Sequence, residues 1–292
     1  MPATLTPLRY PGGKTKYADL FVDIILANHL DNCTFVEVFA GGAGAAISLF
    51  LKGHVKSLIL NDRDVAIYSF WKSVKEYPQE LIKLIRSTRI SMAEWRRQKA
   101  IYDNKDDSNI LILGFATFFL NRCNHSGILG ARPIGGMKQK GNYKLNSRYN
   151  KSTSIAKIEA IAEQSDSLEV FNLDGLCFLD LLKLNYGGRK CLVYFDPPYY
   201  QKGPALYLNH FNNEDHRALR DEILECPFPW VLSYDTHKDI IDMYNNYDCN
   251  LYRNSLRHTI NGNTKAEELI VSKLSLPNYL ESVHSINNRG RA

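Results

Sequence analysis

The chain of 292 residues lacks any apolar run long enough to cross a bilayer. Its longest apolar stretches, LILGFATFFL and FVDIILA, fall far short of the ~20 residues that a membrane-spanning helix needs. The N-terminal stretch, MPATLTPLRYPGGK, lacks the apolar core of a secretion signal. We therefore expect a cytoplasmic protein without a membrane span.

Paired cysteines are missing as well. The six cysteines form no CxxC pair and lie near no regularly spaced histidine. Zinc sites and disulfide frameworks both depend on such spacings. We expect reduced thiols in the core or on the surface, and no metal.

Acidic residues are absent from one long stretch, between Ser108 and Ile158, although the formal net charge of the whole chain is only +5. A stretch of one sign that also contains Asn, Gln, Gly and Tyr suits the surface of a polyanion. The alternative is a solvated basic loop without a ligand, and charge alone does not decide between the two. The basic residues of the stretch are Arg122, Arg132, Lys138, Lys140, Lys144, Arg148, Lys151 and Lys157.

Short apolar runs, several of which end in an acid, alternate with helix-like segments. This pattern predicts an α/β fold with a mainly parallel sheet and helices on both faces. Ligands of such sheets bind beyond the carboxyl ends of the strands, so the acids there are candidate site residues. The expected strands are 34–40, 57–62, 168–174, 191–196, 230–235, 249–253 and 268–274.

The alternation breaks between about Val65 and Asn150. Apolar spacings of three and four predict helices up to Ser87, and ILILGFATFFLNR predicts a buried helix. The segment after it is rich in Gly, Asn and Lys and has no periodicity. We therefore expect an inserted subdomain at 65–150, helical and then loop-rich, within a main domain formed by 1–64 and 151–292.

A glycine cluster stands between an expected strand and an apolar helix, in EVFAGGAGAAISLFL. Gly41, Gly42 and Gly44 allow a sharp turn and close approach to a ligand, beside the free N–H groups of a helix N-terminus. Asp62 ends the next strand, where a carboxylate can accept hydrogen bonds from both ribose hydroxyls. The pair suggests an adenosine-containing ligand, whereas the structural alternative for Asp62 is a helix N-cap.

The sequence CLVYFDPPYY carries a buried strand up to one carboxylate and a stiff turn. An exocyclic amine of a nucleobase is a poor nucleophile, because its lone pair is delocalised into the ring. Asp196 and the carbonyl of Pro197 can hold such an amine, while Pro197 and Pro198 fix their geometry. Tyr199 offers a face on which a flipped base can stack. The structural alternative is a plain surface turn.

Four motifs in this order, YPGGK (Tyr10 to Lys14), EVFAGGAG, NDRD and DPPY, resemble the D12-class, Dam-type N6-adenine-specific DNA methyltransferases. LNRCNHSGIL, SYD and EELIVSK are similar to further segments of that family, and the likeness covers nearly the whole chain. The resemblance implies a Rossmann-like methyltransferase sheet with an inserted target-recognition subdomain. It also implies S-adenosyl-L-methionine as the cofactor, S-adenosyl-L-homocysteine as its product and no metal.

The resemblance also implies residue roles. Among the cofactor residues, Lys14 is expected near the carboxylate, Asp62 at the ribose and Asp196 at both the amine end and the target base. The complete cofactor set is Tyr10, Lys14, Phe39, Gly41, Asp62 and Asp196. DNA contacts are expected from Arg122, Asn124, Lys138, Lys140 and Arg148.

The implied reaction is site-specific methylation of adenine N6 in double-stranded DNA, by direct transfer to a flipped-out base. N4-cytosine methylation and RNA-base amine methylation use similar chemistry and stay open as alternatives. A non-catalytic DNA-binding homologue is the alternative of another class. No Pro-Cys dipeptide occurs, which argues against a covalent attack on cytosine. No obligatory specificity subunit is expected, and a cognate restriction endonuclease is a candidate partner.

Overall fold

The computed structural model describes residues 4–10, 14–200, 211–257 and 265–283. By its internal packing the chain divides into two units. Unit 1 comprises Met1–Ala18 and Ala40–Asp174, and unit 2 comprises Asp19–Phe39 and Gly175–Ala292. These units border at other positions than the expected domains, so the assignment of 65–150 to target recognition stays a prediction.

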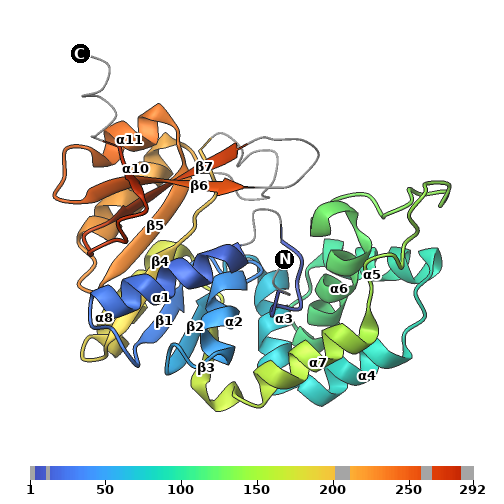
Figure 1. The fold of residues 1–292 in the computed structure, drawn as a ribbon. Coiled ribbons are helices and arrows are strands. Elements are labelled where there is room, and N and C mark those ends of the chain that lie inside the picture. Colours follow the sequence, from blue (N-terminus) through green and yellow to red (C-terminus); the bar gives the residue numbers. More distant parts are fainter. Residues whose placement is uncertain (1–3, 11–13, 201–210, 258–264, 284–292) are drawn as a thin grey trace. The chain divides into compact units, whose positions relative to one another are not determined.

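Unit 2 contains parallel strands that continue into antiparallel ones (Figure 1). β1, β4 and β5 are parallel, while β7 is antiparallel to β5, and β6 is antiparallel to both β7 and β8. The prediction of an α/β sheet is confirmed, and the sheet is mixed. The order is β1 (Thr34–Glu37), β4 (Cys191–Phe195), β5 (Trp230–Asp235), β7 (Lys265–Ser272), β6 (Asn250–Arg257), β8 (Glu281–Ser282).

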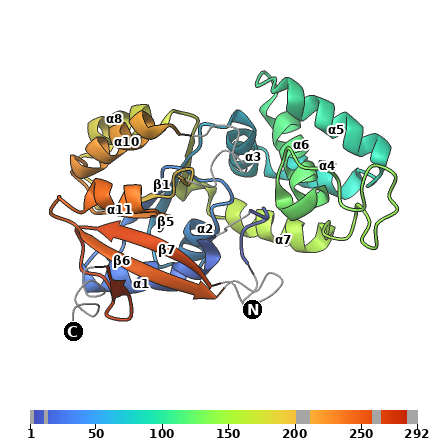
Figure 2. The same ribbon diagram turned by 90° about the horizontal axis from the view of Figure 1, so that it is seen from above.

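Helices cover both faces of the unit 2 sheet, as predicted (Figure 2). On one face Phe21 meets Phe35 and Tyr194 edge-on, with ring centroids 5.0 and 4.7 Å apart. On the other face His216 Nδ1 lies 2.7 Å from the hydroxyl of Tyr234. The first face belongs to α1 (Tyr17–Ala27), and the second to α8 (Gly175–Tyr186), α10 (Asn213–Leu224) and α11 (Lys238–Tyr244).

Unit 1 contains a parallel strand pair and most of the helices. The pair is β2 (Ser57–Asn61) and β3 (Leu168–Phe171), and the apolar side chains of β2 are fully buried. Asn61 joins the two strands beyond their ends, because its amide donates to Leu173 O and accepts from Leu173 N. The helices are α2 (Gly44–Leu51), α3 (Val65–Glu76), α4 (Pro78–Ser87), α5 (Met92–Asn104), α6 (Ile110–Cys123) and α7 (Lys151–Ala162).

Polar side chains define where the helices of unit 1 begin. Asp64, Ser91, Asn109 and Asn150 each accept a hydrogen bond from a backbone N–H in the first turn of the helix that follows. Such caps satisfy N–H groups that have no partner within the helix. α6 is buried along most of its length and packs against α3 and α5. The predicted buried helix is therefore present.

Between α6 and α7 the described chain forms one short 3₁₀ helix, η2 (His125–Gly127), and a single bridge between Asn124 and Pro133. Gly135 and Gly136 have φ values of +87° and +75°. Gln139 crosses this loop, because its side-chain amide donates to the carbonyls of Ile134 and Gly136. The predicted loop-rich segment is thus held by side-chain hydrogen bonds together with backbone turns, with little regular structure.

None of the helices in the part of the chain that the structure describes has the length and apolar character that a bilayer crossing requires. All six cysteines are free thiols, and Cys33, Cys123 and Cys191 are buried. These thiols agree with the cysteine spacing in the sequence.

Gly114 sets the distance between α6 and α3. A Cβ at this position would lie 2.5 Å from the carbonyl oxygen of Ser69 and 2.5 Å from the hydroxyl oxygen of Ser73, both on α3. We therefore expect Gly114→Ala to destabilise the protein by about 1–3 kcal/mol, despite the better helix propensity of alanine. Urea denaturation followed by circular dichroism measures this difference.

Gly130 provides the matched control, since a Cβ there meets no atom within 4 Å. Gly130→Ala should change the free energy of unfolding by less than about 0.5 kcal/mol. Equal stability of the two variants would contradict the close helix contact.

Candidate active site and nucleic-acid interface

The turn after β1 is held at Gly41. Its N–H donates to Asp62 Oδ2 at 2.8 Å, and its carbonyl accepts from the indole N–H of the buried Trp71 at 2.9 Å. Gly41 has a φ of +45°, in the left-handed region where a side chain is strained. One glycine is therefore fixed from both sides, by the end of β2 and by α3.

Tyr10 lies against this turn. A Cβ on Gly41 would come within 2.9 Å of the Tyr10 ring, and a Cβ on Gly42 would come within 2.7 Å of the Tyr10 Cβ. The hydroxyl of Thr6 donates to Gly42 O at 2.6 Å and fixes the same segment. Unit 1 thus brings Tyr10, Gly41 and Asp62 together, and their role at a cofactor stays a prediction.

Lys14 begins the 3₁₀ helix η1 (Lys14–Lys16), which packs against the start of α2. It is only 5% exposed, and its ammonium lies 5.5 Å from the centre of the Tyr17 ring. Gly44 permits this approach, because a Cβ there would lie 2.7 Å from the hydroxyl oxygen of Thr15. Residues 11–13 of the YPGGK motif lie outside the described residues.

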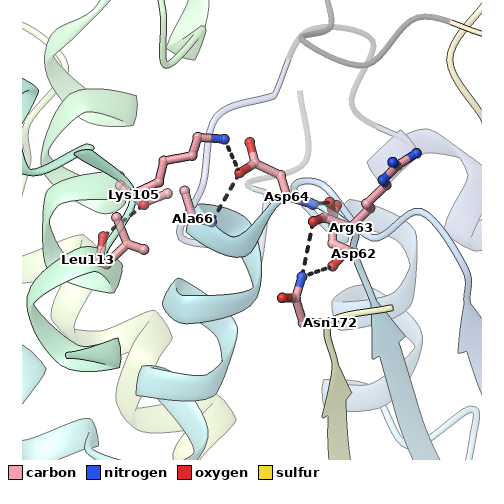
Figure 3. Close-up of polar contacts among 8 residues, drawn as sticks. Asp62, Arg63, Asp64, Ala66, Lys105, Leu113 and Asn172 are labelled. Carbon is pink, nitrogen blue, oxygen red and sulfur yellow. Dashed lines mark hydrogen bonds and ion pairs between the residues drawn. The ribbon is translucent and has the colours of Figure 1, made fainter. Parts of the chain in front are cut away.

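Asp62 accepts a second backbone N–H, that of Asp64, at 2.9 Å. Asp64 caps α3 through Ala66 N and pairs with Lys105 at 2.7 Å (Figure 3). Figure 3 also shows the Asn172 amide donating to the carbonyl of Asp62. The N-cap alternative for Asp62 is therefore wrong, because Asp64 fills that role.

The Asp62 carboxyl has an unusual acidity. Burial raises its pKa to about 6, and the two backbone N–H donors only partly oppose this rise. Close to neutral pH the group can exist in either form. An ionised carboxylate here accepts hydrogen bonds from hydroxyl groups, which is the chemistry a ribose needs.

Phe39 lies in unit 2, at the end of β1. Its ring packs against the start of α8, where a Cβ on Gly175 would lie 3.0 Å from the ring. Phe211 meets the same ring edge-on at 6.1 Å between centroids. Phe39 therefore presents an aromatic face next to a helix N-terminus.

Asp196 follows β4 in unit 2 and is oriented by the neighbouring strand. The hydroxyl of Ser233 on β5 donates to Asp196 Oδ1 at 2.8 Å, and Tyr194 lies 2.7 Å from the same hydroxyl. Because Ser233 donates to the carboxylate, Tyr194 is the donor to Ser233. The Ser233 hydroxyl thus orients one carboxylate oxygen of Asp196, and the Tyr194 hydroxyl orients that of Ser233.

Tyr199 is held from β7. Its hydroxyl donates to Glu268 Oε1 at 2.6 Å, and Glu268 is only 5% exposed. Burial raises the pKa of Tyr199 far above its usual value, with the charges of Asp196 and Glu268 acting in the same direction. The phenol therefore stays protonated, and its ring has one fixed orientation. Pro197 is buried and Pro198 partly exposed between these two anchored residues.

Sequence reasoning assigned no role to Ser233, Glu268 or Tyr200, which lie beside Asp196 and Tyr199. Tyr200 donates its backbone N–H to Asp235 and stacks on His237 at 4.7 Å. The sequence signal for Ser233 and Glu268 is a polar residue inside an apolar strand, in WVLSYD and EELIVS. Such a residue is unfavourable unless a buried partner satisfies it.

The expected DNA contacts differ in exposure. Asn124 is 0% exposed; its oxygen accepts from Trp95 and its amide donates to the carbonyls of Ile128 and Leu129. These bonds assign Asn124 to the folding of the loop, so we do not carry it into the DNA surface. Arg122 is largely buried, whereas Lys138, Lys140 and Arg148 are exposed. Within the described residues, no cluster of His, Cys, Asp or Glu has the arrangement that holds a metal ion.

The fold and these strand-end residues define a class, the α/β methyltransferases. The model of the D12 class N6 adenine-specific DNA methyltransferases matches residues 10–260, and the chain belongs to that family. It is therefore an adenine-N6-specific DNA methyltransferase, and this membership implies S-adenosylmethionine as the methyl donor and DNA as the substrate.

A curated protein and a solved structure are among those similar to the chain. The type II methyltransferase M.MjaIII of Methanocaldococcus jannaschii is 26% identical over 205 residues, which cover 66% of this chain and 68% of the relative. The rRNA methyltransferase aviRa of Streptomyces viridochromogenes has a TM-score of 0.38 and 11% identity, with 96% of this chain and 89% of that one covered.

Asp62 should make cofactor binding depend on pH. Its pKa is raised on folding, so ionising it destabilises the folded chain as the pH rises toward 6. Binding of ribose hydroxyls requires the ionised form. We expect the affinity for S-adenosylhomocysteine to fall about tenfold per pH unit below 6. Calorimetric titrations between about pH 5 and 8 measure this.

Asp62→Asn is the control, since it removes the titrating group and should bind weakly with no pH dependence. A wild-type affinity that stays constant across this range contradicts the ribose assignment.

Ser233 should act on the chemical step through Asp196. We expect Ser233→Ala to lower kcat about 10- to 100-fold, because a hydrogen bond to a charged group contributes about 1.5–3 kcal/mol. The affinity for S-adenosylhomocysteine should change little. Single-turnover methylation assays and calorimetry separate the two effects.

Ser272→Ala is the matched control, because Ser272 is a second buried serine of the same sheet that bonds only Trp230 O and Leu274 N among the contacts described. If both alanine variants lose the same activity, Ser233 acts on stability and not on Asp196.

Proposed function

We propose that the chain methylates adenine N6 at one short DNA sequence, by direct transfer to a base that has left the duplex. The carrying observation is the anchoring of Asp196 by Ser233, at the end of a buried strand. A carboxylate fixed in this way, followed by a proline carbonyl, is suited to hold both hydrogens of an exocyclic amine. The type II relative supports a restriction-modification context, with a cognate endonuclease as the partner.

The residues of unit 1 fit the methyl donor. Tyr10 and the glycine turn form an aromatic cradle that a Cβ on Gly41 or Gly42 would fill. Asp62 is partly accessible and can accept from ribose hydroxyls, while Lys14 carries the charge expected beside a carboxylate. When bound, S-adenosylmethionine supplies an electrophilic methyl group to the amine.

The residues of unit 2 act on the base. Asp196 and the Pro197 carbonyl accept hydrogen bonds from the N6 amine and favour its tetrahedral, nucleophilic form. Tyr199 offers a ring whose orientation Glu268 fixes, and a flipped adenine stacks on it. The residues act by position and hydrogen bonding, without a covalent enzyme intermediate.

Exposed basic residues bind the DNA duplex in this proposal. Lys138, Lys140 and Arg148 lie in a stretch without acids and are accessible, so they contact phosphates. Arg122 is partly buried and adds positive charge near Arg148.

The decisive experiment incubates the protein with S-adenosylmethionine and unmethylated genomic DNA. Nucleoside mass spectrometry and sequencing that reads modified bases should find N6-methyladenine at one short motif. We expect Asp196→Ala to abolish the product and to keep DNA affinity, because the N6 amine loses its acceptor while the exposed basic residues stay unchanged.

Asp242→Ala is the control, an exposed carboxylate on α11 of the same unit. Undiminished methylation by Asp196→Ala contradicts the proposed mechanism. Modified cytosine in place of adenine contradicts the proposed substrate base.

A further inference from the structure

A pocket of about 470 Å³ lies in unit 1, outside the residues assigned above to the cofactor and the amine. Arg9, His125, Gly135, Gly136 and Arg148 are among the residues that line it. We call it the arginine pocket. Its volume falls in the range of about 300–1,000 Å³ that small-molecule sites occupy. It has room for more than a single ion.

The Arg9 side of the pocket is fixed to α6. The Asn121 side chain accepts from Arg9 N at 2.8 Å and donates to Arg9 O at 2.6 Å. Gly127 also touches this peptide, since a Cβ there would lie 2.3 Å from Arg9 O. The backbone of Arg9 therefore has little freedom to move.

The glycine side of the pocket is fixed by Gln139. Its amide donates to Ile134 O at 2.7 Å and Gly136 O at 2.8 Å, and its oxygen accepts from Leu145 N at 2.9 Å. A pocket whose sides are already ordered binds a ligand at a smaller entropic cost.

The arginines in and near the pocket give it a positive charge. Burial lowers the pKa of Arg122 to about 10, with the charges of Arg9 and Arg148 acting in the same direction. Burial and Arg148 likewise lower the pKa of Arg9. Two buried donor atoms, Arg9 Nη1 and Arg122 Nε, have no hydrogen-bond partner among the described residues. Neighbouring like charges cost free energy, and an anion bound beside Arg9 and Arg148 would offset part of that cost.

We propose that the arginine pocket binds one phosphodiester group of the DNA strand together with its sugar, and so sets the register of the duplex. Guanidinium groups donate several parallel hydrogen bonds and match phosphate oxygens in geometry. A neutral base edge lacks the negative charge that neighbouring arginines require. The assignment rests on the proposed function in one respect, that DNA is the substrate.

The test is fluorescence anisotropy of the full chain with a labelled duplex, from about 50 to 200 mM salt. Each phosphate contact contributes about 0.9 to the slope of log K against log salt. We expect Arg148→Gln to reduce the slope by about one and to weaken binding about eightfold at 0.1 M salt. Affinity for S-adenosylhomocysteine should stay unchanged.

Arg189→Gln is the matched control, an exposed arginine before β4 that does not line this pocket. It should keep the wild-type slope. If Arg148→Gln and Arg9→Gln also keep that slope while the wild type methylates DNA, the pocket assignment is wrong and the proposed function stands. A wild type that neither binds nor methylates DNA overturns both.

A second arm uses the duplex that carries the methylated site, with single neutral methylphosphonate linkages. A methylphosphonate at the contacted phosphate should weaken duplex binding by the wild type. It should not weaken binding by Arg148→Gln any further. If the effect of Arg148→Gln depends instead on the identity of one base and on none of the methylphosphonate linkages, that result overturns the proposal in favour of base reading. Thermal stabilisation by inorganic phosphate that requires Arg148, without any change in the DNA slope, overturns it in favour of a free anion.

Discussion

The hydrogen bond from Gly41 N to Asp62 is the contact on which unit 1 depends. It joins the glycine turn to the end of β2, and Trp71 holds the carbonyl of the same glycine from α3. Because Gly41 is in the left-handed region, this turn cannot carry a side chain without strain. Tyr10 then packs on the turn, and the carboxylate that stabilises the backbone also keeps accepting capacity for a ligand. Folding and cofactor chemistry therefore use the same group.

Much of this arrangement was readable from the sequence, and the reason is periodicity. Buried strands such as β2 and β4 have an apolar interior, so their positions and the acids that follow them stand out. Glycine clusters report backbone turns with equal clarity. Strand direction leaves no such mark, since the buried apolar part of β7, residues 269–271, resembles the core of β5 and yet β7 runs antiparallel to β5. The mixed sheet was therefore not predicted in detail.

Residues whose role depends on a distant partner were the ones that sequence reasoning missed or misplaced. Ser233 and Asp196 are 37 positions apart, and Tyr199 and Glu268 are 69 apart. Asn124 looked like a DNA contact because it stands in a basic loop, but its three polar bonds all go to the protein. A polar side chain alone does not reveal whether it is satisfied inside or outside the fold.

The bonds from Asn121 to Arg9 have a consequence for how two ligands affect each other. Arg9 lines the arginine pocket, and the next residue in the chain, Tyr10, covers the glycine turn. One clamped backbone segment thus presents one side chain to each site. Because the segment is held by Asn121, any displacement of it at one site would also move the side chain at the other. Through such a segment, duplex and cofactor would be thermodynamically coupled, and each would alter the affinity of the other by the same factor.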